Sequence, residues 1–270
     1  MRPAEIRVLT EDSAKDAHAT IQALAFELFK LVDPDARPRR LRITPASPDE
    51  ERAMRANLWR STNPRDHRHQ VTLRSTIASR IVEGGFVLFH FDGDRIWGER
   101  DSAALPDTRR KFEALIRTQV RSMLEQHVRG TLGPRRGRER PSAAPTLSEE
   151  QVVAEVDRLL SRLLPLVPYY SVEAWLLQNT YKARLICEEE HGDPSHLSTF
   201  DSFRADRGSL DELMKPKEAT CLGAKHNLAL AAEYFPAPEA DAVDKSFHAA
   251  VETLRACPDL VAVLAETHAS

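Results

Sequence analysis

Short apolar runs alternate with longer amphipathic segments along the N-terminal part of the chain. Three of these runs predict β-strands, at residues 6–10, 40–44 and 85–91. The segments between them carry apolar residues at helical spacing and predict helices, at residues 13–31, 50–59 and 73–81. Strands that alternate with helices in this order are typical of a parallel sheet with crossover helices. The expected fold class is therefore α/β.

The third run is the most strongly apolar, and the rest of the sequence is best understood from it. It is rich in Phe and Val and begins at Gly85, a composition typical of a strand that is buried on both faces. The run stops abruptly at Asp92-Gly93-Asp94. Because open α/β folds place their ligands where parallel strands end, these two carboxylates are candidates for a binding site.

The remainder of the chain is predicted to be mainly helical. A clear amphipathic helix is expected from Asp107 to about Val128, and another begins at Ser148. Residues 164–170 look extended, and Ser171 is expected to cap a further helix. Three more helices are predicted towards the end of the chain, at residues 224–234, 245–256 and 258–266.

Residues 129–147 interrupt this pattern. They hold five Arg against one Glu, with three Pro and three Gly and no periodicity, so they predict a flexible basic insertion. Such a basic segment can contact phosphates, although most charge runs are simply solvated. The expected organisation is an α/β core at residues 1–128, the insertion at residues 129–147, a continuation of the core at residues 148–190 and a helical C-terminal region at residues 191–270.

Charge and cysteine content narrow the class of protein. The 38 Lys and Arg against 41 Asp and Glu exclude a broadly basic DNA-coating protein, but not a local basic surface. The three cysteines are widely spaced and form no Cys-x-x-Cys pair, which argues against a disulfide framework and for a reducing compartment. No apolar stretch reaches the roughly 18 residues of a membrane span. We therefore expect a cytoplasmic protein without a membrane partner.

The candidate chemistry lies where the first and third predicted strands end. Glu11 follows the first strand, and Asp92 and Asp94 follow the third. If these strands are adjacent and parallel, the three acids converge, and hard carboxylate oxygens of this kind suit Mg²⁺ or Mn²⁺. The aspartates would hold the metal, and the glutamate would serve as general acid or base or bind a second metal. The alternative is that Asp-Gly is an ordinary turn.

These residues resemble the Toprim family of topoisomerases, primases, OLD-family nucleases and recombination proteins. The resemblance rests on a strand that ends in Glu, in residues 8–11, and on a later strand that ends in Asp-x-Asp, in residues 87–94. The segment 168–177 also resembles the Glu-Ala-Trp-Leu-Leu segment of small bacterial Toprim-like proteins, which include phage-defence proteins found beside an ATPase. Over residues 5–190 the resemblance implies a Rossmann-like parallel sheet flanked by helices.

Two positions depart from the Toprim pattern. Asp12 follows the candidate glutamate where Toprim proteins usually have Gly at a tight backbone turn, and Asp is less suited than Gly to a left-handed conformation. Asp12 also adds a carboxylate beside the expected metal site and is a possible extra ligand. Arg95 follows Asp94, and a basic side chain at this point could hold a phosphate.

Three further residues have both a structural and a functional interpretation. Glu173 is explained by the helix dipole if it lies in a first helical turn, or it is an additional metal-site acid. Trp175 is expected in the core rather than as a stacking platform. His90, within the third strand, is expected to be a buried histidine with a satisfied hydrogen bond rather than a ligand.

The resemblance implies a Mg²⁺- or Mn²⁺-dependent nuclease or nucleic-acid-processing enzyme that acts on DNA or RNA in phage defence or DNA repair. A second hypothesis is a non-catalytic Toprim-like subunit that serves an ATPase or toxin partner. A third is a glycosyltransferase-like enzyme, because Asp-x-Asp after a strand also binds metal and nucleotide sugar. A phosphatase with an aspartyl nucleophile is disfavoured, since its Asp-x-Asp normally follows the first strand.

Overall fold

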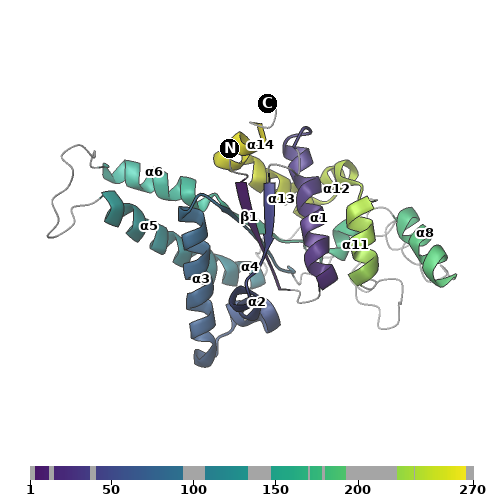
Figure 1. The fold of residues 1–270 in the computed structure, drawn as a ribbon, viewed down its shortest axis with the longest axis horizontal. Coiled ribbons are helices and arrows are strands. Elements are labelled where there is room, and N and C mark those ends of the chain that lie inside the picture. The colour runs from purple at the N-terminus through teal and green to yellow at the C-terminus, as the bar shows by residue number, and fades with distance from the viewer. Residues whose placement is uncertain are drawn as a thin grey trace.

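Four parallel strands form the centre of the molecule in a computed structural model of the chain (Figure 1). Across the sheet their order is β2 (Leu41–Pro45), β1 (Ala4–Thr10), β3 (Phe86–His90) and β4 (Leu163–Leu166). The structure describes residues 4–11, 15–36, 41–93, 107–132, 147–169, 171–177, 180–192, 224–233 and 235–265. The α/β class and the three strands expected from the apolar runs are confirmed.

The pairing of β1 with β3 is the part of the topology that matters most for the site. The two strands are hydrogen-bonded in parallel, with Thr10 opposite His90 at their carboxyl ends. The prediction that these ends lie side by side is therefore confirmed. On the other side of β3, β4 forms the edge of the sheet, and Pro165 is tolerated there because an edge strand can do without one backbone donor.

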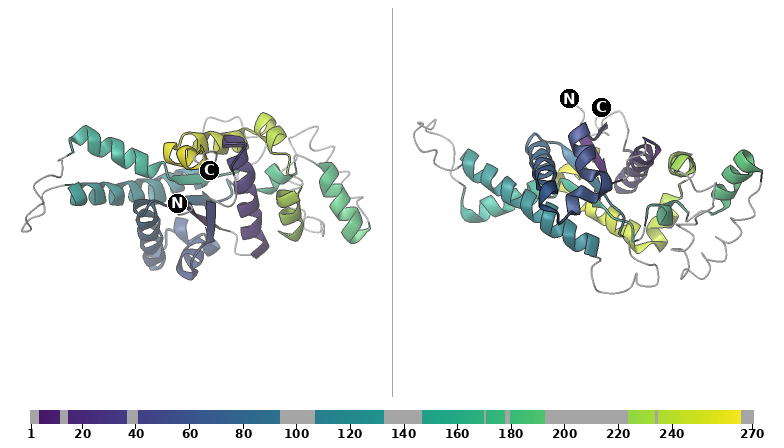
Figure 2. Two further views of the ribbon diagram at one scale, coloured as in Figure 1. Left: turned by 45° about the horizontal axis from the view of Figure 1, so that its top comes forward. Right: turned by 90° about the horizontal axis from the view of Figure 1, so that it is seen from below.

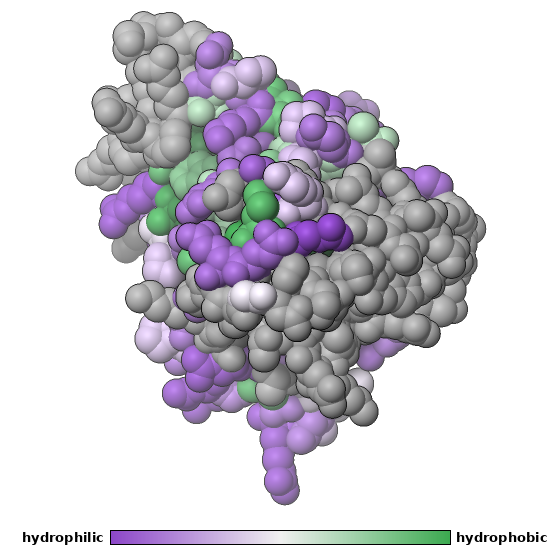
Figure 3. All heavy atoms as spheres, turned by 90° about the vertical axis from the view of Figure 1, so that its right-hand side faces the viewer, coloured by the Kyte–Doolittle hydropathy of each residue, from purple (hydrophilic) through white to green (hydrophobic). Residues whose placement is uncertain are grey.

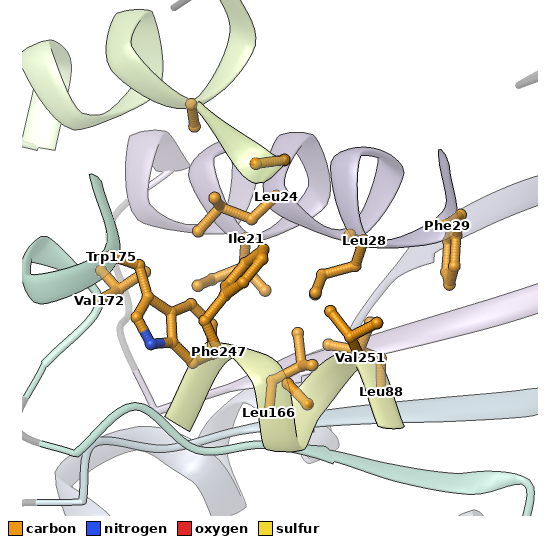
Figure 4. Close-up of a cluster of buried hydrophobic side chains, with 14 of the residues drawn as sticks. Ile21, Leu24, Leu28, Phe29, Leu88, Leu166, Val172, Trp175, Phe247 and Val251 are labelled. Carbon is orange, nitrogen blue, oxygen red and sulfur yellow. The ribbon is translucent and has the colours of Figure 1, made fainter. Parts of the chain in front are cut away.

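One face of the sheet is covered by α1 and by the C-terminal helices. Their bounds are Lys15–Val32 for α1, Ala224–Glu233 for α11, Ala237–Val243 for α12, Lys245–Arg255 for α13 and Pro258–Ala265 for α14. Ile21 and Leu24 of α1 point towards Phe247 of α13, above Leu166 of β4 (Figure 4). The C-terminal helices thus complete the core of the sheet instead of forming a separate unit.

The other face is covered by helices from the middle of the chain. These are α2 (Pro48–Met54), the 3₁₀ helices η2 (Arg55–Arg60) and η3 (Pro64–Asp66), α3 (His67–Val82), α4 (Asp107–Phe112), the π-helical turn η5 (Glu113–Arg117), α5 (Thr118–Leu132) and α6 (Glu149–Leu160). Trp59, Phe89, Phe91 and Phe112 interlock here, with ring centroids 5.2–6.0 Å apart. Each such pair contributes about 0.5–1.5 kcal/mol beyond its area burial.

Helices α5 and α6 pack against each other and extend away from the sheet as an arm (Figures 1 and 2). A capping box begins α6, where Ser148 accepts a hydrogen bond from the backbone of Gln151 and the Gln151 side chain accepts one in return. Arg129 of α5 forms ion pairs with Glu125 and Glu149. Helix α5 continues to Leu132, so the expected helix end near Val128 is wrong. Residues 133–146 of the predicted insertion lie outside the described residues.

The Trp-containing segment forms α7, Glu173–Leu176, and is followed by α8, Thr180–His191. Trp175 is fully buried and donates a hydrogen bond to the Ser246 hydroxyl at 2.8 Å, so its expected place in the core is confirmed. The expected cap at Ser171 is wrong: Val172 occupies the N-cap, and the Ser171 hydroxyl is buried with no hydrogen-bond partner among the described residues.

Few large hydrophobic side chains are exposed among the described residues. Figure 3 views the side of the molecule on which α8 lies, where hydrophilic residues predominate and hydrophobic ones form small patches. Among the described helices, none has the combination of length and apolar character that crossing a bilayer requires.

Candidate active site at the carboxyl ends of β1 and β3

Two predicted site residues meet where β1 and β3 end. Glu11 follows β1, and its Oε1 accepts a hydrogen bond from the backbone N–H of Asp92 at 2.8 Å. The predicted convergence is thus confirmed for these two residues, which we call the acid pair. Their side chains are 11% and 24% exposed, and Glu11 Oε2 and Asp92 Oδ1 are themselves buried. Asp12 and Asp94 lie outside the described residues.

The row of side chains beneath the acid pair ends in two buried polar groups. Thr10 and His90 continue the apolar rows of β1 and β3 on the α1 face, and the Thr10 hydroxyl lies 2.9 Å from His90 Nδ1. The expected burial of His90 is confirmed, but its hydrogen bonding is satisfied only at Nδ1, because Nε2 is buried with no hydrogen-bond partner among the described residues. The other ring nitrogen, Nε2, lies 3.9 Å from Asp92 Oδ1.

His90 is held in its neutral form. Complete burial lowers its pKa to about 3, and the positive charge that His18 of α1 can carry adds to the effect. A neutral imidazole beneath the acid pair does not cancel the carboxylate charge. The positive charge that neutralises Glu11 and Asp92 must therefore come from a group other than His90.

Arg60, the last residue of η2, supplies part of that charge. Its Nη2 lies 3.8 Å from Glu11 Oε2, and its guanidinium also lies over the ring of Trp59, 5.7 Å from the centroid. At 3.8 Å the contact is an ion pair and too long for a hydrogen bond. Nothing in the local sequence distinguishes Arg60 from other surface arginines, so sequence reasoning missed it. Its role depends on how η2 packs against the sheet.

Gly93 fixes the turn that carries Asp92. A Cβ at this position would lie 2.3 Å from the carbonyl oxygens of both Pro168 and Tyr169, a distance that no real Cβ tolerates. The Gly93 N–H donates to Pro168 O at 3.1 Å, and the Thr108 hydroxyl donates to Gly93 O at 3.0 Å. Close approach of the segment after β4 therefore explains the glycine, and the same contacts hold the Asp92 backbone in place.

Glu173 is engaged elsewhere. Its Oε1 accepts a hydrogen bond from Asn227 Nδ2 of α11 at 2.9 Å, and it lies in the first turn of α7. Among the residues that the structure describes, no three His, Cys, Asp or Glu side chains are grouped so that they could hold a metal. Glu173 consequently does not join Glu11 and Asp92 in such a group.

The donor chemistry of the acid pair fits a hard divalent cation. Mg²⁺ is usually bound by one or two carboxylates and keeps several of its waters, so two oxygen ligands from adjacent strand ends suffice. Comparison with known proteins adds no further constraint, because no family model, curated protein or solved structure matches the chain.

Proposed function

We propose that the protein is a Mg²⁺-dependent, Toprim-type enzyme that cleaves or otherwise processes phosphodiester bonds in nucleic acid. The observation that carries the proposal is the acid pair, in which Glu11 and Asp92 meet at the ends of adjacent parallel strands. In a parallel sheet this edge is the usual place for a ligand. The resemblance of residues 8–11 and 87–94 to Toprim motifs supports the same chemistry.

The roles follow from the surroundings of each side chain. Asp92 would hold the metal together with Asp94, which the sequence places two residues later. When bound, the cation supplies charge neutralisation at the phosphate and orients the attack. Glu11 has one oxygen fixed by the Asp92 N–H, and its other oxygen, Oε2, faces Arg60. Oε2 is therefore the oxygen through which Glu11 would share the cation with Asp92 or exchange a proton.

The test is a cleavage assay on single- and double-stranded DNA and on RNA, with Mg²⁺ or Mn²⁺, for the protein alone and together with a candidate partner ATPase. We expect metal-dependent cleavage that falls at least about 100-fold in Glu11→Gln and Asp92→Asn, the scale of losing a general acid–base group. Asp157→Asn removes an exposed acid of α6 that pairs with Arg121, and it serves as the matched control with unchanged cleavage. Metal binding without cleavage of any substrate would instead indicate the non-catalytic partner subunit.

A further inference from the structure

A cleft of about 660 Å³ opens beside the acid pair. One wall is formed by η2 and the loop that follows it, and the other by Asp107, Thr108 and Lys111 of α4. This volume lies within the range of about 300–1,000 Å³ typical of small-ligand sites. The cleft can therefore hold a group of nucleotide size.

Two residues belong to both the cleft and the surroundings of the acid pair. Arg60 lines the cleft and forms the ion pair with Glu11. Thr108 lines the cleft as well, and its hydroxyl donates to the carbonyl of Gly93, the residue after Asp92. A ligand in the cleft therefore lies next to the candidate catalytic groups.

The polar lining of the cleft contains both cations and acids. Arg60 and Lys111 are its cations, Asp66 and Asp107 are its acids, and Thr62 adds a hydroxyl group. The Ser61 hydroxyl donates to Asp66 Oδ2 at 2.5 Å. Lys111 Nζ lies 2.7 Å from Asp107 Oδ2, and this hydrogen bond lowers the pKa of the Asp107 carboxyl. Arginine, lysine and hydroxyl side chains are the usual contacts to phosphate in protein complexes with nucleic acids.

We propose that this cleft binds a phosphate group of a nucleic-acid strand, with Arg60 and Lys111 as its cationic contacts. The inference rests on the proposed function, because it places the substrate beside the acid pair. The 3.8 Å contact of Arg60 with Glu11 is easily exchanged. Once a divalent cation neutralises Glu11, the Arg60 guanidinium can exchange its contact with Glu11 for one with the phosphate. Metal and phosphate binding should then strengthen each other.

The experiment measures binding of a fluorescein-labelled single-stranded DNA oligonucleotide by anisotropy, with and without Mg²⁺, over a range of salt concentrations. AMP and inorganic phosphate serve as competitors that separate a strand from a free nucleotide or a free anion. Lys111→Gln should weaken oligonucleotide binding about tenfold, which corresponds to about 1.4 kcal/mol. It should also reduce the slope of log affinity against log salt by about one, the signature of one lost phosphate contact.

Two pairs of variants separate the cleft from general charge effects. Arg110→Gln removes a neighbouring cation of α4 that also pairs with Asp107 but does not line the cleft, so it should leave affinity and salt slope nearly unchanged. Thr62→Glu places a negative charge in the cleft and should weaken binding. Thr72→Glu, on the exposed surface of α3, should not.

The outcomes distinguish this inference from the proposed function. Equal binding by wild type, Lys111→Gln and Thr62→Glu overturns the cleft as the phosphate site, even if the enzyme cleaves DNA. Wild type that binds neither oligonucleotide, AMP nor phosphate overturns it too, as does tighter binding of free phosphate than of the strand. Oligonucleotide binding that depends on Lys111 but does not respond to Mg²⁺ supports the cleft and contradicts the metal-dependent function.

Discussion

The carboxylates at the two ends of the parallel sheet have different surroundings. Towards the amino end, Glu5 of β1 lies 3.1 Å from Arg80 of α3, and Asp259 of α14 lies 2.7 Å from Arg162, just before β4. At the carboxyl end, Glu11 and Asp92 face a backbone amide, a neutral histidine and one arginine at 3.8 Å. The amino end thus uses its acids in close ion pairs that join helices to the sheet, whereas the ion pair between Arg60 and Glu11 at the carboxyl end is longer.

This difference indicates which end is structural and which is functional. Close ion pairs with additional hydrogen bonds stabilise a fold only when every charge is satisfied, as it is for Asp259 between Arg158 and Arg162. Acids that two adjacent strands carry to the carboxyl edge of a parallel sheet lie instead where such sheets bind their ligands. The predictions below probe this comparison from the largest expected effect to the smallest.

The turn at the carboxyl end should tolerate substitution least. Gly93→Ala should lower the free energy of unfolding by about 4 kcal/mol or more, because the new Cβ would meet two backbone carbonyl oxygens that cannot move aside cheaply. Chemical denaturation monitored by circular dichroism measures the loss. Gly130→Ala in α5 is the matched control, because no atom lies within 4 Å of the position that the new Cβ would take. This variant should stabilise the protein by up to about 1 kcal/mol. A mild effect at Gly93 would contradict the tight packing described for this turn.

The second prediction concerns pH. Because the pKa of His90 falls from 6.5 to about 3 on folding, the unfolded chain binds more protons between these values. The stability due to neutral His90 is therefore complete above about pH 6.5 and is lost as the pH falls towards 3, by up to about 4 kcal/mol. Denaturation across this range should show a shallower pH dependence in His90→Gln than in wild type. An equal pH dependence in the two proteins would contradict a neutral, buried His90.

The third prediction compares the two ends directly. Asp259→Asn should cost about 2 kcal/mol, since it leaves Arg158 and Arg162 without the carboxylate they share. Asp92→Asn should leave the metal-free stability unchanged or slightly raised, because it relieves repulsion at the acid pair. Thermal denaturation in the presence of a chelator checks both variants. A larger loss of stability for Asp92→Asn than for Asp259→Asn would contradict a structural role for the acids at the amino end and a functional role for those at the carboxyl end.

The sequence predicts the sheet better than it predicts the surroundings of the site. Apolar runs located β1, β2 and β3, because strands buried on both faces need such runs. The edge strand β4 is short and contains Pro165, so it looked merely extended. The order of elements predicted a parallel sheet, and the convergence of Glu11 and Asp92 followed only on the condition that β1 and β3 are adjacent, which the structure meets.

What the sequence could not predict depends on long-range packing. Arg60 reaches Glu11 only because Trp59 anchors η2 among Phe89, Phe91 and Phe112. The influence of His18 on His90 likewise depends on the way α1 lies across the sheet. Neither contact corresponds to a pattern of neighbouring residues that could be recognised in the sequence. The cleft next to Arg60 has the same origin, since its walls come from η2 and α4, which are far apart in sequence.

The central claim is that the carboxyl end of the sheet holds a divalent cation on the acid pair, and the change in melting temperature on adding Mg²⁺ tests it most directly. A ligand that binds only the folded state stabilises it by about 1.4 kcal/mol at tenfold excess over its Kd. The account predicts this rise for wild type and for Asp259→Asn, and its loss in Asp92→Asn and Glu11→Gln. A melting temperature that does not respond to Mg²⁺ or Mn²⁺ in wild type, or that rises equally in all four proteins, would contradict the claim.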